Sequence, residues 1–170
     1  NHSSAGGQQA WEWAESAGNS DIDFGQEVVS TPSGHVYVAG LFMDSINFGS
    51  CNANNPSGVT WYALFVAKFN SNGTCQWISE AYASSGGNIP RDDYRFSSIS
   101  IAIDSQENVY ITTTSKNYAD FTFGNHSVSV GNNEFSILLI ASICIQSLLY
   151  LTEGGTDRPP PISPPSLIIV

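Results

Sequence analysis

The sequence TPSGHVYVAG, at residues 31–40, combines a turn with a short strand and decides the fold. Pro, Ser and Gly favour the turn, and Val36 and Val38 then alternate with Tyr37 as in a strand with one buried face. The sequence DSQENVYITT, at residues 104–113, repeats this arrangement. Its recurrence predicts a repeated β unit.

Two further pairs of matching segments support the repeat. The sequence INFG at residues 46–49 corresponds to FTFG at residues 121–124, and ALFVAKF at residues 63–69 corresponds to ILLIASI at residues 137–143. All three matches keep their order at an offset of roughly 73–75 positions. We therefore expect two copies of one β unit, each with four or five short strands.

The local patterns between these segments also indicate strands and turns. Residues 98–103 (SISIAI) alternate with period two, and Asn72-Gly73 lies before Trp77 as a hairpin turn would. No stretch of helical period is bounded by capping residues. The chain is predicted to be all-β.

The expected organisation has four segments. They are an N-terminal segment (residues 1–10), a first β unit (11–76), a second β unit (77–151), and a Gly/Pro-rich linker with an apolar strand (152–170).

The repeat resembles the SBBP-type β-propeller repeats of secreted and surface bacterial proteins. The resemblance covers about residues 11–143 and rests on GHVYVAG (residues 34–40), Phe48-Gly49 and FVAK (residues 65–68). In the second unit, Glu107-Asn108 replaces the turn glycine. The resemblance implies tandem propeller-blade-like antiparallel units.

Two such units are too few for a closed propeller, which typically has 4–8 blades. The chain is then part of a longer protein, or a compact β-sandwich, or a unit that closes by assembly between subunits. The last two together are favoured over the first, because the sequence after the second unit has a different character.

Composition excludes some functions. The 170 residues carry 15 acidic and 5 basic side chains, for a net charge of −10. Five scattered cations cannot form the basic face that nucleic-acid binding needs. An acidic, weakly charged composition is typical of a soluble extracellular or cell-surface protein.

Cysteines and sequons agree with such a location. Cys51 and Cys75 are candidates for a disulfide, whereas Cys144 lies in an apolar run and is expected to be a buried free thiol. No Cys/His spacing matches a zinc site. Three sequons begin at Asn1, Asn72 and Asn125, and they are glycosylation candidates if the chain passes a glycosylating secretory route.

The sequence contains no enzyme motif that we can identify, so we expect a protein without catalytic residues or a cofactor. Asp21 and Asp23 occupy positions equivalent to Asp92 and Asp93, before the first long strand of each unit. These carboxylates are expected in solvated turns, with a weak calcium site as the alternative.

Aromatic residues suggest a binding function. Trp61 and Tyr62, with Trp11 and Trp13, are candidates for stacking on sugars, although a core role is favoured for such residues.

The last part of the chain departs from the repeat. Residues 135–151 are almost wholly apolar, and we favour a buried strand pair there over a membrane span. The Pro-rich sequence PPPISPP at residues 159–165 predicts a stiff polyproline II spacer. Four apolar residues follow it and are candidates for docking on the sheet edge of a neighbouring subunit: Leu167, Ile168, Ile169 and Val170.

The sequence thus predicts a non-catalytic extracellular structural protein, a subunit of a cell-surface or filamentous assembly whose partners are copies of itself. The alternative is an adhesin-like or lectin-like module that binds glycans or proteins. A weaker alternative is a fragment of a larger propeller protein.

Overall fold

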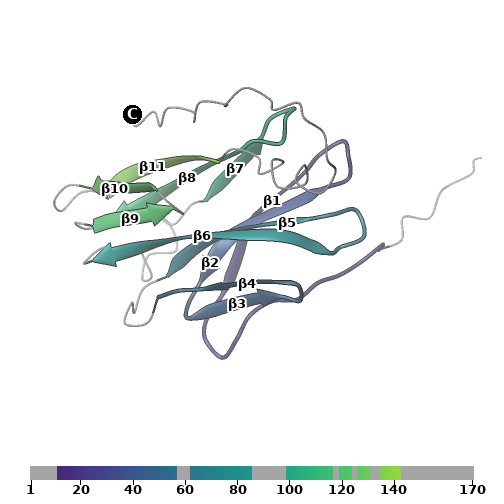
Figure 1. Ribbon diagram of the computed structural model, residues 1–170, viewed down its shortest axis with the longest axis horizontal. Helices are drawn as coiled ribbons and strands as arrows, with labels where there is room; N and C mark the ends of the chain where they lie inside the picture. The colour runs from purple at the N-terminus through teal and green to yellow at the C-terminus, as the bar shows by residue number, and fades with distance from the viewer. Residues whose placement is uncertain are drawn as a thin grey trace, which may run out of the picture.

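The computed structural model describes residues 11–56, 62–85, 99–116, 119–123, 126–130 and 135–142. These residues form β-strands and no helix, which confirms the all-β class (Figure 1). The strands are β1 (Phe24–Ser30), β2 (Val36–Phe42), β3 (Ser45–Phe48), β4 (Cys51–Asn54), β5 (Ala63–Phe69), β6 (Cys75–Ser85), β7 (Ser100–Ile103), β8 (Val109–Lys116), β9 (Ala119–Phe123), β10 (His126–Val130) and β11 (Phe135–Ser142).

A six-stranded antiparallel sheet is the centre of the structure. Its order is β1-β2-β5-β6-β9-β10, so the four strands β1, β2, β5 and β6 are extended by the β9–β10 hairpin. The expected unit boundary after residue 76 falls inside β6, which pairs with β5. The sheet therefore contains strands of both predicted units.

The two units repeat the same strand pairing. In the first unit Ser30 pairs with Val36, and in the second Ile103 pairs with Val109, an offset of 73 positions. The hairpins β3–β4 and β9–β10 are likewise equivalent, because the closing pairs are residues 48 and 51 and residues 123 and 126, an offset of 75.

The third matched segment aligns differently from the sequence comparison. Val36 pairs with Phe69, and Val109 pairs with Ser142, so β5 and β11 are also offset by 73 positions rather than 74. By register, the equivalent of Lys68 is therefore residue 141 and not residue 142. A one-residue difference matters, because it exchanges the two faces of a strand.

Both faces of the central strand β5 are covered by apolar side chains. Every residue of β5 is buried, and successive residues contribute to different clusters. Leu64 and Val66 pack in a cluster that includes Ile99, Val109 and Ile111 of the second unit. The residues between them pack against β3 and β4 on the other face. Among the described strands there is no closed propeller, as expected for two units.

Gly40 allows β1 to lie close to β2 and β5. A Cβ atom at Gly40 would lie 2.0 Å from the Phe24 carbonyl oxygen and 2.7 Å from the Phe65 ring, so no larger residue fits without a shift of the backbone. At Gly25 of β1, by contrast, an added Cβ would meet nothing within 4 Å.

Three hairpin turns share one backbone geometry. The turns begin at Thr31, Asn70 and Asp104, and each has two hydrogen bonds, from residue i to i+4 and back from i+3 to i. The residue at i+3 is left-handed in all three: Gly34 (φ 85°), Gly73 (φ 80°) and Glu107 (φ 62°). This pattern is typical of a type I turn followed by a bulge, and it includes the turn predicted at Asn72-Gly73.

The apolar sequence at residues 135–151 begins as the strand β11, and its remainder lies outside the described residues. The part of the chain that the structure describes holds no helix with the length and hydropathy needed to cross a membrane. Residues 1–10 and 152–170, including the Pro-rich spacer, also lie outside the described ranges.

Candidate functional site

Glu107 combines an unusual backbone with a largely buried charge. Its left-handed φ suits glycine, and the equivalent positions in the other two turns are glycines. A side chain in this region costs of the order of 1 kcal/mol. Such strain persists when the surroundings hold the residue in place, and it often marks a functional position. The contacts of the Glu107 side chain therefore define the candidate site.

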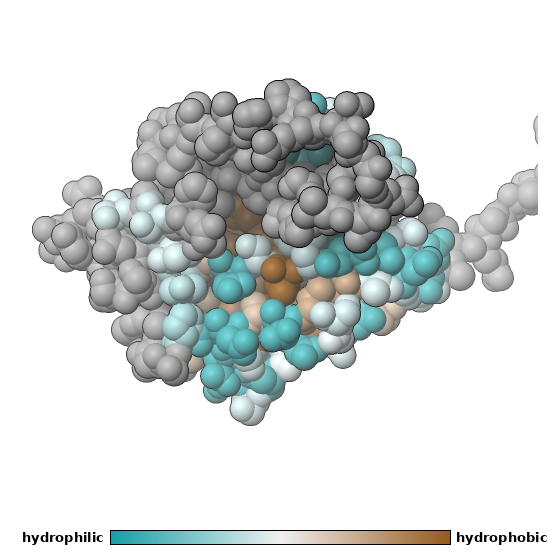
Figure 2. Space-filling model, viewed as in Figure 1, coloured by the Kyte–Doolittle hydropathy of each residue, from teal (hydrophilic) through white to brown (hydrophobic). Residues whose placement is uncertain are grey.

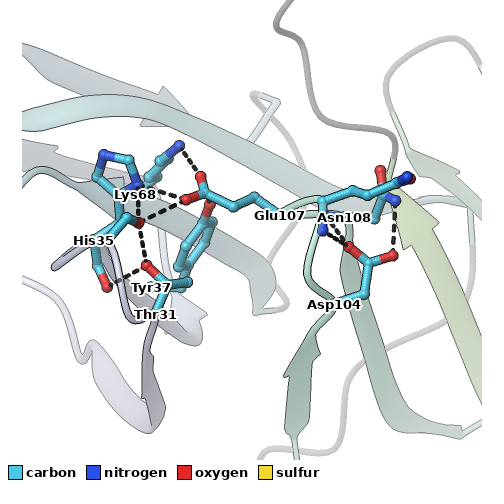
Figure 3. A network of polar contacts seen from close by, with 9 residues as sticks. Thr31, His35, Tyr37, Lys68, Asp104, Glu107 and Asn108 are labelled. Atoms are coloured by element: carbon cyan, nitrogen blue, oxygen red, sulfur yellow. Dashed lines mark hydrogen bonds and ion pairs between the residues drawn. The ribbon is translucent and has the colours of Figure 1, made fainter.

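The Glu107 carboxylate crosses from the second unit to the first and meets four side chains there (Figure 3). Oε1 accepts from Ser33 Oγ at 2.8 Å and lies 2.8 Å from His35 Nδ1. Oε2 accepts from Tyr37 Oη at 2.9 Å and from Lys68 Nζ at 2.6 Å. We call these five residues the Glu107 cluster. It joins the turn before β8 to β2, β5 and the turn before β2.

Lys68 explains why the first unit needs a negative charge at this place. It lies on the central strand β5 and is 8% exposed, and its Nζ is 5.5 Å from the centre of the Tyr37 ring. A buried ammonium group is costly unless it is paired. Glu107 supplies the paired charge, and the Tyr37 ring adds a favourable electrostatic contact. The cluster therefore pairs a buried charge of the first unit with a carboxylate of the second.

The carboxyl group of Glu107 is strongly acidic. Burial raises its pKa, but hydrogen bonds from Lys68, His35, Ser33 and Tyr37 outweigh that effect and lower the pKa to about 2. These donors all favour the charged form. Glu107 is thus an anion at neutral pH and throughout the mildly acidic range.

The same turn is stabilised by Asp104. Its Oδ1 accepts from the backbone N–H groups of Gln106 and Asn108, both at 2.8 Å, as Asn70 Oδ1 does in the equivalent turn. Hydrogen bonds from Asn108 lower the pKa of Asp104, and the contact with Asp104 raises the pKa of Tyr110. This arrangement holds Glu107 in its left-handed conformation.

The cluster contains Ser, His and Glu but does not have the geometry of a catalytic triad. Ser33 Oγ lies 3.1 Å from His35 Nδ1, and Glu107 approaches the same nitrogen. In a triad the hydroxyl and the carboxylate bind opposite nitrogens of the imidazole, so that one nitrogen can take the hydroxyl proton while the other donates its N–H to the carboxylate. The cluster is instead a network of hydrogen bonds and an ion pair that links the two units.

The predicted carboxylate pairs fall in different parts of the chain. Asp21 is exposed, and Asp23 uses both oxygens to accept backbone N–H groups, from Asn19 at 3.1 Å and from Met43 at 3.2 Å. Asp92 and Asp93 lie outside the described residues. Within the described ranges, no group of three or more His, Cys, Asp or Glu residues is arranged to hold a metal ion.

Cys51 and Cys75 form a disulfide that joins β4 to β6, with their Cα atoms 5.9 Å apart. Ser50 Oγ donates to the Cys75 carbonyl oxygen beside it. Of the sequons, Asn72 is exposed in the turn before β6. The other two, at Asn1 and Asn125, lie outside the described residues, as does Cys144.

The aromatic candidates for sugar stacking do not form one surface. Tyr62 is 3% exposed and packs against Phe24, so it presents no face to a ligand and belongs to the core. Trp61 lies outside the described residues. Trp13 stacks on Phe69 at 5.9 Å, and Trp11 is 99% exposed. The four apolar residues 167–170 are also outside the described part of the chain.

The Glu107 cluster was not predicted from the sequence. The available signal was the replacement of a turn glycine by Glu107, which weakens the repeat locally and places a charged side chain at a left-handed position. In comparisons with known proteins, no family model, curated protein or solved structure matches the chain significantly.

Proposed function

We propose that this chain is a non-catalytic extracellular structural protein, a subunit of a cell-surface or filamentous assembly held by β-strand contacts between copies. The observation that carries the proposal is the pairing of β9 with β6. Through it, the β9–β10 hairpin is added to the edge of the sheet that β1, β2, β5 and β6 form, so the fold already uses strand addition between segments far apart in the sequence. A contact of this kind between chains would extend the same principle.

Two features support a structural and extracellular role. The disulfide between Cys51 and Cys75 would persist in an oxidising compartment, and the net charge of −10 favours solubility. The Glu107 cluster, with its two bonds to one imidazole nitrogen, supports a role in joining units rather than in catalysis.

A surface-binding module is the second candidate, and Trp11 favours it. An indole that is 99% exposed offers a face on which a sugar ring could stack. The resemblance to SBBP-type repeats supports a third reading, in which these units belong to a larger propeller protein.

Light scattering and negative-stain microscopy of the undenatured protein test the proposal. We expect ordered polymers, and we expect deletion of residues 159–170 to yield folded monomers. A matched variant, in which Leu167, Ile168, Ile169 and Val170 are replaced by serine, keeps the length of the tail and should also be monomeric. A monomeric full-length protein would refute the assembly and favour the binding module. Glycan-array binding that is lost in Trp11→Ala would then support that second function.

A further inference from the structure

The turn between β5 and β6 presents an acceptor motif for N-linked glycans in a well-defined backbone conformation. Asn72, Gly73 and Thr74 form the motif, whose third residue must be serine or threonine. Asn70 Oδ1 accepts from the backbone N–H groups of Asn72 at 3.0 Å and of Thr74 at 2.9 Å. The Asn70 N–H donates to the Thr74 carbonyl oxygen, and the Asn70 carbonyl oxygen accepts from the Gly73 N–H, both at 3.0 Å. The turn is therefore stabilised by a neighbouring asparagine and not by the side chains of the motif.

The two side chains that the motif requires are exposed. Among the residues that the structure describes, neither the Asn72 amide group nor the Thr74 hydroxyl has a hydrogen-bond partner. The bonds of both residues are made by their backbone, including the one from Gln76 Nε2 to the Thr74 carbonyl oxygen at 3.2 Å. An asparagine amide has two N–H groups, and neither is occupied here. Both side chains are thus available to a modifying enzyme.

The rest of the turn lies close to neighbouring elements. A Cβ atom built on Gly73 would lie 2.7 Å from the Trp13 ring, so the indole lies directly against this glycine. Trp13 also stacks on Phe69, the last residue of β5, with ring centroids 5.9 Å apart. The Ser71 Cβ atom lies 3.2 Å from the place that a Cβ on Gly34 would take, in the turn before β2. These contacts fix the position of the turn without using the side chains that the motif presents to solvent.

The turn lies at the ends of two strands and not along an edge of the sheet. It connects β5 to β6, whereas the edge strands of the six-stranded sheet are β1 and β10 (Figure 1). The described surface is mainly hydrophilic in the view of Figure 2, which suits a bulky and strongly solvated substituent. A glycan on this turn would extend away from the strand ends and leave both sheet edges accessible.

We infer that Asn72 is the acceptor of an N-linked glycan, which is transferred from a lipid-linked oligosaccharide diphosphate. The new bond joins the Asn72 side-chain nitrogen to C1 of the first sugar, and the bond from C1 to the phosphate oxygen of the carrier breaks. The lipid diphosphate leaves with the electron pair of that bond, and the amide nitrogen gives one proton to a base of the transferring enzyme. This inference rests on the extracellular location within the proposed function and not on assembly.

Mass spectrometry of the full chain, secreted from a eukaryotic cell behind a cleavable leader, tests the inference. We expect the peptide that contains Asn72 to carry a glycan, and enzymatic release of that glycan in heavy-oxygen water to convert Asn72 to a labelled aspartate. Asn70 lies in the same turn but outside the motif, so it is an internal control and should stay unmodified. An unmodified Asn72 in the secreted protein overturns the inference, whatever the state of Asn1 and Asn125.

Matched variants at the third position of the motif separate modification from folding. Thr74→Ala removes the hydroxyl and should abolish the glycan on Asn72, whereas Thr74→Ser retains a hydroxyl and should keep it. Both variants preserve the backbone bonds of residue 74, so the Cys51–Cys75 disulfide should form in each. A glycan that persists in Thr74→Ala would show that the motif does not direct the modification, and the inference would be wrong.

Thermal unfolding before and after enzymatic release of the glycan supplies a second readout. We expect similar unfolding temperatures, because the Asn72 side chain has no partner in the described structure to lose. A glycan that markedly lowered the unfolding temperature would show that Asn72 faces the folded chain, which contradicts the geometry on which the inference stands.

The inference and the proposed function fail separately, since light scattering reports assembly and mass spectrometry reports the glycan. Polymers without a glycan on Asn72 would overturn the inference and leave the structural function standing. A glycosylated monomer would overturn the assembly and leave the acceptor site standing.

Discussion

Replacing Glu107 by glutamine isolates the contribution of one charge to the joint between the units. The Glu107→Gln variant would keep the size of the side chain and the strained φ, but it would leave Lys68 buried beside a neutral group. The fall in the pKa of Glu107 from 4.5 to about 2 corresponds to about 3 kcal/mol, since a tenfold change in acidity is about 1.4 kcal/mol. We therefore expect Glu107→Gln to lower the free energy of unfolding by about 3 kcal/mol at pH 7.

The pH dependence of this loss follows from the same pKa. Because the folded protein holds the pKa of Glu107 below its ordinary value, the stabilisation is complete above about pH 5 and is lost as the pH falls through 4.5 toward 2. At pH 3 the difference between the parent and the variant should fall to less than about half of its value at pH 7.

Urea denaturation followed by tryptophan fluorescence measures both quantities. The control is Glu27→Gln, a change of the same chemistry on the exposed edge strand β1, which should alter stability by less than about 0.5 kcal/mol. Equal stability of Glu107→Gln and the parent protein at pH 7 would refute the role of the cluster. A large loss that did not change between pH 7 and pH 3 would show that packing, and not charge, is responsible.

Three further predictions concern the backbone and the disulfide. Gly40→Ala should lower the free energy of unfolding by at least about 2 kcal/mol, because the added Cβ would clash with a backbone carbonyl oxygen. The control Gly25→Ala should change the free energy of unfolding little. Thermal unfolding compares the two variants, and equal losses would contradict the packing argument. Glu107→Gly should be about 1 kcal/mol more stable than Glu107→Ala in urea titrations. Both variants lose the carboxylate, but only glycine removes the backbone strain of the positive φ. If Glu107→Ala were the more stable variant, backbone strain at this position would be excluded. Replacing Cys51 and Cys75 by serine should cost about 3 kcal/mol for a separation of 24 residues, measured by the same titration, and an unchanged midpoint would show that the closed loop contributes nothing.

Features that depend on neighbouring residues could be predicted from the sequence. The strand that starts at Val36 and the turn that contains Gly73 follow from local alternation and turn chemistry, and both occur in the structure. The recurrence of these patterns also predicts two units of one topology. Their register was predicted only in part, because β5 and β11 are offset by 73 positions rather than the 74 of the sequence match.

Features that depend on the choice of a distant partner could not be predicted. The alternating pattern of β9 is compatible with pairing on any free edge, and nothing local selects β6. Similarly, Glu107 lies 39 positions from Lys68 and 72 from His35, so no sequence motif connects them. Tyr62 is an aromatic residue of the kind that can stack on a sugar. In the structure, however, it is buried against Phe24, a residue distant in the sequence.

The addition of β9 to the edge of β6 has a consequence for how the chain folds while it is being synthesised. A ribosome releases β6 before β9, so the edge of β6 has no partner from this joint until residue 123 has emerged. During that interval two nascent chains on one messenger can exchange hairpins, because β9 of either chain fits either edge. Slow translation between residues 85 and 119 should therefore raise the yield of swapped dimers, and a chain stopped before β9 should aggregate.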